Sequence, residues 1–250
     1  MQAETKPRIA IPLPHGGDPE YAERAIPQYE RAVELAGGEP VRIPLDRSPE
    51  EVMKLIERCD GVVLPGSKAD VDPAKFGAVK HEKTDPADPK RDTVDELLLQ
   101  DAYNMRKPLL GICYGLQILN VYRSGTLLQH IESAVNHEAG RKVPVAHNVE
   151  IEPGSKLAEI IGERGAIPAN SSHHQSADVI GDGLKISARC VEDGIIEAIE
   201  GTAPDHFVVA VQWHPERSFD DDERSRNIFR ALVEAAKEKH LDLAGEFEGA

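Results

Sequence analysis

Short apolar runs alternate with stretches of helical periodicity through the first half of the chain. Apolar runs of four to six residues, bounded by Gly, Pro or charged positions, are typical of buried strands, and the intervening apolar positions recur at helical spacing. Strands that alternate with helices predict a mostly parallel sheet covered on both faces. The predicted strands are 8–13, 40–44, 61–64 and 108–112. Two predicted helices lie within 21–36 and 116–121, and two more begin near Ser48 and Asp92.

The second half of the chain is richer in strand patterns. Apolar and polar residues alternate over 145–151, and the segments 184–188 and 195–199 flank Asp193-Gly194, a pair typical of a β-hairpin. An apolar run over 207–212 predicts a further strand, and 225–237 predicts a closing helix. The pattern therefore predicts an α/β fold with an additional strand-rich hairpin part in its C-terminal half.

The sequence gives no sign of a boundary between two domains. The sequence shows no internal repeat and no change of composition between its halves, which predicts one domain over residues 1–240. The acidic tail, 241–250, is expected to fray. A long segment rich in Pro, Asp and Lys, 68–90, is predicted to be a functional or mobile loop.

Charge and composition exclude several functional classes. Asp and Glu number 44 against 29 Lys and Arg, which gives a net charge of −15, and aromatic residues make up 4% of the chain. A nucleic-acid-binding protein needs a basic face or a base-stacking surface, so neither duplex nor single-strand binding is expected. No apolar run approaches the ~20 residues of a membrane span, and no signal-like segment follows Arg8. A cytoplasmic protein without membrane partners is therefore expected.

Cys113 carries the sharpest chemical signal. Gly111-Ile-Cys113-Tyr-Gly115 follows a predicted strand and precedes a predicted helix, the setting of a nucleophile elbow. A helix N-terminus favours thiolate over thiol, so iodoacetamide is expected to modify Cys113 first, even below neutral pH. A buried cysteine in a tight glycine-flanked turn is the alternative. Cys59 and Cys190 lie in apolar patterns and are predicted core residues; three cysteines cannot form a complete disulfide framework.

His214 is the best-placed base for such a thiol. It follows the predicted strand 207–212 and lies two residues before Glu216. In an extended segment residues two apart point the same way, so Glu216 would orient the imidazole and stabilise its protonated form. The alternative is an exposed histidine at a strand end beside an acidic neighbour.

Three motifs give the chain a family resemblance. Gly-Ile-Cys-Tyr-Gly-Leu-Gln at 111–117, Asn-Ser-Ser-His-His-Gln at 170–175 and Val-Gln-Trp-His-Pro-Glu at 211–216 resemble the class I glutamine amidotransferase family. They are most similar to its γ-glutamyl hydrolase branch, of the γ-glutamyl-γ-aminobutyrate hydrolase type. The resemblance runs from about Ile9 to about Leu232, and is also carried by 64–67, 70–73, 76–77, 91–92, Asn120 and 125–127.

The resemblance implies a flavodoxin-like fold and a cysteine hydrolase of polyamine catabolism. Its triad would be Cys113, His214 and Glu216, and a γ-glutamyl amide would be cleaved through a thioester to glutamate and an amine. Backbone N–H groups of Gly66 and Tyr114 would stabilise the oxyanion. The expected partner is a small γ-glutamyl substrate, no cofactor is expected, and a homodimer is left open. The substrate-binding residues it implies are Gln117, Ser172, His173 and His174.

Two other functions stay open at this point. The chain could be the glutaminase subunit of an amidotransferase that passes ammonia to a partner. It could instead be a catalytically silent binding module, although an intact Cys–His–Glu set argues against that. A metal site at His173-His174 is not expected, because adjacent strand residues point apart and no third ligand has useful spacing. Pro65-Gly66-Ser67-Lys68 lacks the full pattern of a phosphate loop.

The chain departs from its relatives beside the nucleophile. Tyr114 stands where the branch usually has Arg, Leu116 where it often has His, and 122–125 replaces a glycine-rich stretch. A γ-glutamyl substrate carries an α-carboxylate, which needs a cation or several N–H donors. Arg123 is the first cation that follows the nucleophile in the sequence, at or just past the end of the predicted helix. One hypothesis is that Arg123 takes over that function while Tyr114 reshapes the pocket; the other is that Arg123 is a solvated surface residue.

Overall fold

The fold is built on one nine-stranded sheet. The computed structural model describes residues 6–162 and 165–248, and of 241–248 the helical backbone alone. The strand order is β2-β1-β3-β4-β11-β10-β9-β6-β7; neighbours are parallel from β2 to β11 and antiparallel from β11 to β7. The strands are β1 Arg8–Pro12, β2 Glu39–Ile43, β3 Gly61–Leu64, β4 Leu109–Ile112, β6 His147–Ile151, β7 Gly165–Ala169, β9 Leu184–Cys190, β10 Ile196–Gly201 and β11 Val208–Val211, with β5 Leu127–Leu128 and β8 Ser176–Ala177 in a separate pair. The predicted α/β class is confirmed, as is the hairpin of β9 and β10.

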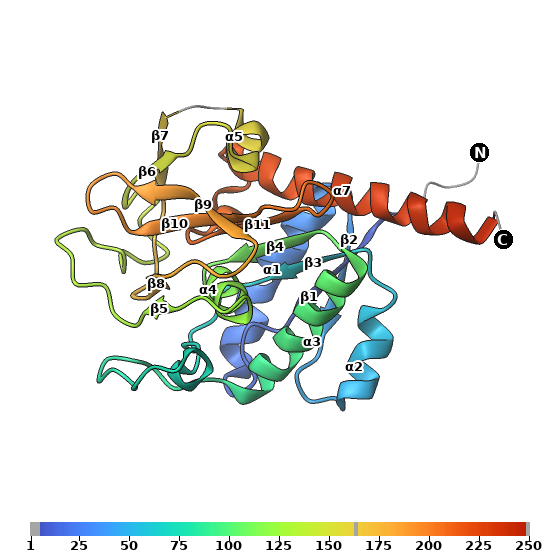
Figure 1. Ribbon diagram of the computed structural model, residues 1–250, viewed down its shortest axis with the longest axis horizontal. Helices are drawn as coiled ribbons and strands as arrows, with labels where there is room; N and C mark the ends of the chain where they lie inside the picture. The colour runs from blue at the N-terminus through green and yellow to red at the C-terminus, as the bar shows by residue number, and fades with distance from the viewer. Residues whose placement is uncertain (1–5, 163–164, 249–250) are drawn as a thin grey trace.

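Helices cover both faces of the sheet (Figure 1). One face carries α1, α5, α6 and α7, and the other carries α2, α3 and α4. Side chains alternate between the two cores along each strand, as a sheet buried on both faces requires: Ile9 and Ile11 lie in the first core and Ala10 in the second. The helices are α1 Pro19–Leu35, α2 Pro49–Ile56, α3 Pro89–Met105, α4 Tyr114–Tyr122, α5 Lys156–Ile161, α6 Pro215–Ser218 and α7 Glu223–Glu248, with a 3₁₀ turn, η1, over Pro73–Phe76.

Local capping explains where two helices begin. Ser48 and Glu51 form the reciprocal capping box that opens α2, and the helix begins at Pro49, beside the predicted start at Ser48. The predicted cap of α3 at Asp92 is wrong: Asp88 accepts from the N–H groups of Lys90 and Arg91, because Pro89 is preorganised for the first helical position. Asp92 lies one turn further on and is free to accept a different bond, described below.

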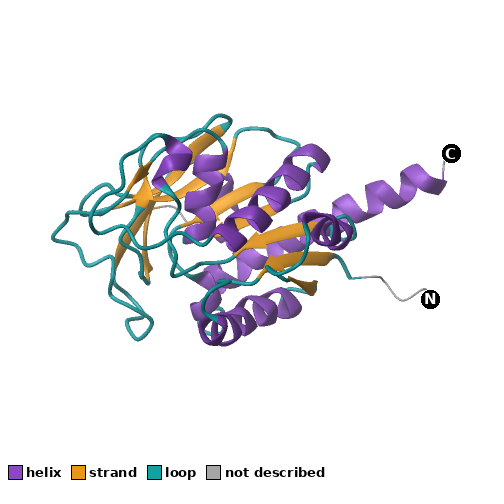
Figure 2. Ribbon diagram, turned by 90° about the horizontal axis from the view of Figure 1, so that it is seen from below, coloured by secondary structure: helices purple, strands orange, loops and turns teal. Residues whose placement is uncertain are grey.

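Two long connections gather at one end of the sheet. Residues 65–88 follow β3 and residues 129–146 follow β5, and both lie at the end where β4 and β11 finish (Figures 1 and 2). Ligands of open α/β sheets bind at the carboxyl ends of the strands, so these loops wall the expected site. The opposite end is occupied by α7, which continues to Glu248 through the region predicted to fray; residues 249–250 lie outside the described part. None of the helices described is both long and apolar enough to cross a membrane.

Candidate active site

Cys113 occupies a strained turn between β4 and α4. Its backbone has φ +54° and ψ −106°, although it is not a glycine. Such a conformation costs on the order of 1–3 kcal/mol and persists only where the surroundings enforce it. The Cys113 N–H donates to the carbonyl of Val211 at 2.8 Å, which ties the turn to the end of β11. The predicted elbow is therefore present.

The two flanking glycines are required by space. A Cβ on Gly115 would lie 2.1 Å from the Leu64 carbonyl oxygen, and one on Gly111 would lie 2.8 Å from the Gly115 carbonyl oxygen. Both contacts are with backbone, which cannot give way as a flexible side chain would. The spacing seen in the sequence thus reflects a turn that closes directly against β3.

His214 and Glu216 form a buried hydrogen-bonded pair at the end of β11. Nδ1 of His214 lies 2.8 Å from Oε1 of Glu216, and both residues are buried. The segment is not extended as the sequence analysis assumed: α6 begins at Pro215, and its first turn brings Glu216 under the ring. Since a carboxylate only accepts, Nδ1 carries the proton, and Nε2 is left with a lone pair and no hydrogen-bond partner among the described residues.

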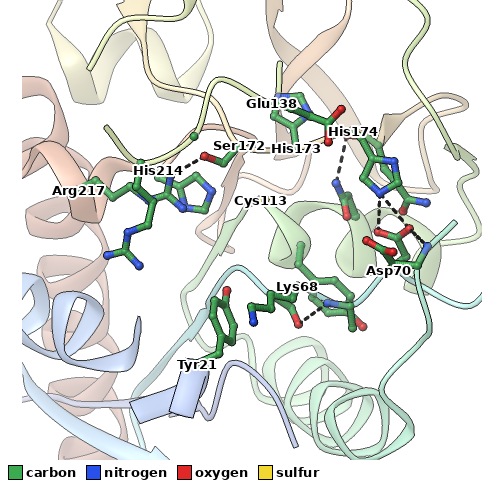
Figure 3. Close-up of a pocket in the computed structure, with 18 residues that line it drawn as sticks. Tyr21, Lys68, Asp70, Cys113, Glu138, Ser172, His173, His174, His214 and Arg217 are labelled. Atoms are coloured by element: carbon green, nitrogen blue, oxygen red, sulfur yellow. Dashed lines mark hydrogen bonds and ion pairs between the residues drawn. The ribbon is translucent and has the colours of Figure 1, made fainter. Parts of the chain in front are cut away.

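The fold brings Cys113 and His214 to one point. A Cβ on Gly66 would lie 3.0 Å from Cε1 of His214 and 3.5 Å from Cβ of Cys113, so both side chains border the same small space. Both also line a pocket of about 420 Å³ (Figure 3). Cys113 and His214 therefore border one pocket, and Glu216 lies on the other side of the His214 ring.

Burial decides the resting protonation of this site. It raises the pKa of the Cys113 thiol to about 12, more than the nearby Arg217 guanidinium lowers it. It also lowers the pKa of His214, against the opposing charge of Glu216. Burial works against the ionised Glu216 as well, but the His214 ring holds the pKa of Glu216 below its ordinary value. The predicted low thiol pKa is wrong, because desolvation outweighs the helix N-terminus; the resting pair is a thiol and a neutral imidazole.

The two predicted oxyanion donors differ in their surroundings. The Tyr114 N–H lies where it lowers the pKa of the Cys113 thiol, so it is directed toward the sulfur. The Gly66 N–H instead donates to the Tyr29 hydroxyl at 3.1 Å, and Gly66 is not among the described residues that line the pocket. The structure thus disagrees with the prediction for Gly66, because the buried Tyr29 hydroxyl already occupies its donor.

The predicted substrate-binding residues all line the pocket. These are Gln117, Ser172, His173 and His174. The amide nitrogen of Gln117 is 3.2 Å from the carbonyl of Gln175, which fixes the Gln117 side chain in the wall. His174 pairs with Asp70 across the mouth, with Nε2 3.1 Å from a carboxylate oxygen, and Figure 3 shows this pair opposite Arg217 and His214.

Arg217 brings a positive charge next to Glu216. Its Nη1 donates to the Ser172 hydroxyl at 2.8 Å, and its Nε lies 3.5 Å from Oε1 of Glu216. Lys68 and Arg141 also line the pocket. Sequence reasoning missed Arg217, although it directly follows the His-Pro-Glu motif; the first turn of α6 is what aims it at the pocket.

Arg123 is not part of this site. Its Nε donates to the carbonyl of Asp182, and its guanidinium lies 4.6 Å from the centre of the Tyr103 ring. The hypothesis that Arg123 faces the substrate carboxylate is therefore wrong, because the end of α4 directs it away from the pocket, to the loop before β9.

Tyr114 is held by the helix behind it. Its hydroxyl donates to Oδ1 of Asp92 at 2.6 Å, and the guanidinium of buried Arg91 lies 5.1 Å from the centre of its ring. Tyr114 lines the pocket while its polar end faces α3, so it fills the space without bringing a charge. The side chains of Leu116 and Cys59 are both buried in the same core.

Several described residues are grouped closely enough to hold a metal ion. One group is His137, His173 and Glu197, fully buried; others are His137, Cys190 and Asp193, and Asp70, Asp85 and His174. His173 and His174 do point apart, as expected for adjacent residues. The expectation that no third ligand lies near is wrong for His173, whose partners come from distant segments.

Comparisons of the sequence find a matching family and similar proteins. The model of the peptidase C26 family matches residues 13–216. A candidate glutamine amidotransferase of Mycobacterium tuberculosis is 42% identical over 212 residues, covering 83% of this chain and 66% of that protein. The γ-glutamyl-γ-aminobutyrate hydrolase PuuD of Escherichia coli K12 is 32% identical over 221 residues, covering 84% and 85% of the two chains.

Solved structures support the fold. A candidate component of GMP synthase from Thermoplasma acidophilum superposes with a TM-score of 0.69 at 15% identity, covering 97% of this chain and 100% of the other. The glutaminase domain of Trypanosoma brucei CTPS, with bound acivicin, gives a TM-score of 0.61 at 18% identity, covering 93% and 94%. At such identities the likeness concerns the fold alone.

Proposed function

The chain belongs to the peptidase C26 family, and we propose that it hydrolyses γ-glutamyl amides through a γ-glutamyl thioester on Cys113. The observation that carries the proposal is the strained Cys113 elbow, which borders the same pocket as the buried His214–Glu216 pair. Strain at a cysteine that shares a pocket with an oriented imidazole is the pattern of a nucleophile and its base.

The proposed reaction begins with a proton transfer within the site. Nε2 of His214 takes the thiol proton of Cys113 as the sulfur attacks the γ-carbonyl carbon, and Glu216 stabilises the imidazolium that forms. Because the resting thiol is neutral, the thiolate is generated only as the substrate is attacked. The Tyr114 N–H is proposed to meet the negative charge that develops on the carbonyl oxygen.

The thioester then forms and breaks. The tetrahedral intermediate collapses when the C–N bond breaks, and the amine leaves with the proton that His214 holds. His214 next takes a proton from water as the water attacks the thioester carbonyl, and returns that proton to the sulfur when the C–S bond breaks, which releases glutamate and the Cys113 thiol. His214 therefore serves as base, acid, base and acid in turn, and it ends each cycle as the neutral imidazole that burial favours.

We assign the substrate α-carboxylate to Arg217. This guanidinium is partly exposed in the pocket wall and already donates to Ser172, so a carboxylate there would be held between a cation and a hydroxyl. Charge-assisted hydrogen bonds of this kind are the strong ones.

A kinetic panel tests the function. Steady-state hydrolysis of γ-glutamyl amines, γ-glutamyl amino acids and glutamine is measured for the whole chain and for Cys113→Ser. Turnover of γ-glutamyl amides, lost by at least a thousandfold in Cys113→Ser, is expected. No turnover of any member by correctly folded protein would contradict the proposal and favour a silent binding module.

Glutamine is the informative member of that panel, because some relatives carry the name of glutamine amidotransferases. A kcat/KM for glutamine well above those for the other amides would favour the second candidate, a glutaminase that passes ammonia to a partner. A preference for larger leaving amines favours the hydrolase.

A further inference from the structure

A second group of histidines surrounds one carboxylate behind the wall of the pocket. Glu197, on β10, is fully buried in the strand-rich half of the sheet. Its Oε1 lies 3.3 Å from Nδ1 of His137, 3.0 Å from Nε2 of His147 and 3.5 Å from Nε2 of His173. The three histidines come from three separate segments, and each side chain is at most 2% exposed.

The outer hydrogen bonds of two of these rings fix their tautomers. Nδ1 of His173 lies 2.9 Å from the carbonyl of Gln175, and Nε2 of His137 lies 2.9 Å from Oδ2 of Asp193. Both partners are acceptors, so these two nitrogens carry the protons. In the neutral rings, the nitrogens that face Glu197 therefore hold bare lone pairs.

Two lone pairs and a carboxylate thus converge without a donor between them. Neither oxygen of Glu197, nor Nδ1 of His137, nor Nε2 of His173 has a hydrogen-bond partner among the described residues. Buried acceptors that face one another repel unless a positive charge lies between them. Nε2 of His147, 3.0 Å from Oε1, can offer at most one N–H to this group, so the repulsion among the remaining acceptors is relieved by a cation, either an added proton or a metal ion.

The geometry favours a metal ion. In a tetrahedral zinc site with bonds of about 2.0–2.1 Å, neighbouring ligand atoms stand about 3.3 Å apart, close to the 3.3 and 3.5 Å found here. All three ligand atoms lie within 4.8 Å of one another. Metal-binding histidines also donate their second N–H to a carboxylate or backbone carbonyl, as both rings do here.

We infer that His137, His173 and Glu197 form a binding site for a divalent transition-metal ion of the zinc class. Two imidazoles and one carboxylate suit such ions better than Mg²⁺ or Ca²⁺. His147 closes one side of the site, packed at 4.6 Å between ring centres against His137.

An ion has a route to this site and a structural consequence there. A cavity of about 330 Å³, formed mainly by residues 130–138, reaches both His137 and His173. His173 also lines the reaction pocket, where Figure 3 shows it beside Glu138. A bound ion would therefore fix one wall of the pocket from behind, without taking part in the reaction.

Metal binding by the whole, untagged chain tests the inference. The protein is stripped with a chelator, and Zn²⁺ is then titrated in competition with a chromophoric chelator, with Co²⁺ absorption as a second readout. One ion per chain is expected, and binding is expected to be lost in His173→Gln and in Glu197→Gln. The control is His206→Gln, a buried histidine outside the group that contacts the carbonyl of Lys107.

Asp193→Asn keeps the test decisive if the buried variants fail to fold. Asp193 lies at the β9–β10 turn, accepts from Nε2 of His137 and is not one of the three proposed ligands, so this variant is expected to bind Zn²⁺ about 10–100-fold more weakly. No stoichiometric binding by the unmodified chain, or unchanged affinity in Asp193→Asn, would overturn the inference and leave protonated histidines as the cation.

Discussion

The molecule holds two sets of buried histidine and carboxylate, and they are arranged in opposite ways. At the pocket, His214 points an N–H at Glu216 and turns its lone pair toward the reaction space. Behind the pocket, His137 and His173 point their N–H groups outward and turn their lone pairs toward Glu197. The outer hydrogen bond of each ring decides which nitrogen is left to act.

The two sets also share a frame. Glu197 lies on β10, and its carbonyl accepts from the N–H of Gln212, two residues before His214. The neighbouring strands β10 and β11 therefore position both groups. His214, the proposed base, must have a nitrogen that faces the pocket, whereas Glu197 must be enclosed by its histidines. Histidine and glutamate serve different chemistry at the two sites because neighbouring segments set the tautomer of each histidine. The residue type alone does not set it.

Removing the charge at the pocket carboxylate is expected to have the largest effect. Glu216→Gln keeps the shape of the side chain but no longer stabilises the protonated ring, so kcat for a γ-glutamyl amide should fall about a thousandfold or more. The matched change, Glu197→Gln, should chiefly lower metal affinity. Parallel measurement of kcat and Zn²⁺ affinity in both variants checks this; a small loss of kcat in folded Glu216→Gln would remove Glu216 from the mechanism.

Replacing Arg217 is expected to have the next largest effect. Arg217→Gln removes the cation assigned to the α-carboxylate, so kcat/KM should fall about tenfold or more, mainly through KM. Arg123→Gln is the matched control, because Arg123 contacts Tyr103 and Asp182 outside the pocket. Equal kinetics for the two variants would leave the carboxylate with another partner.

The pH profile should show a modest but directional shift. Burial lowers the pKa of His214, so the ring stays unprotonated and able to act as a base until the pH falls below its ordinary value of about 6.5. The acid limb of kcat/KM is therefore expected below pH 6.5. An acid limb at or above neutrality, with the protein still folded, would show that the charge of Glu216 outweighs burial in setting the pKa of His214.

The smallest effect is expected from the backbone strain at Cys113. Cys113→Gly relieves the left-handed conformation, while Cys113→Ala keeps a Cβ and hence the strain. Relative to Cys113→Ala, the glycine variant should have a free energy of unfolding higher by about 1 kcal/mol, after the larger entropy of unfolded glycine is subtracted. Urea denaturation measures the difference, and a less stable glycine variant would show that the turn is unstrained.

Local signals in the sequence predicted most of what the structure contains. The apolar runs identified the parallel strands, Ser48 marked the start of α2, and the glycine-flanked motif identified the turn at Cys113, because each depends on neighbours within a few residues. The motif residues 117 and 172–174 were correctly placed at one pocket. These features follow from short-range geometry and from the family resemblance.

The misses depend on contacts between distant segments. The pKa of Cys113 depends on burial by loops far away in the sequence, and the Gly66 donor is taken by Tyr29, 37 residues away. Arg123 is the first cation after Cys113 in the sequence, whereas the cation that lies beside Glu216 in the pocket wall is Arg217, 104 residues further along the chain. Likewise, His137 and Glu197 are 60 residues apart and meet only through the antiparallel strands.

The absence of room around the Cys113 turn has a consequence for how this site can be altered. Any side chain at Gly115 would collide with the backbone of β3, so variation at that position would displace the nucleophile itself. The loops 65–88 and 129–146 supply the outer wall, and their pocket-lining residues, such as Lys68 and Glu138, are not glycines wedged against backbone. Directed evolution toward a different leaving amine should therefore recover its beneficial substitutions in those loops, and a library that randomises the turn should yield almost none.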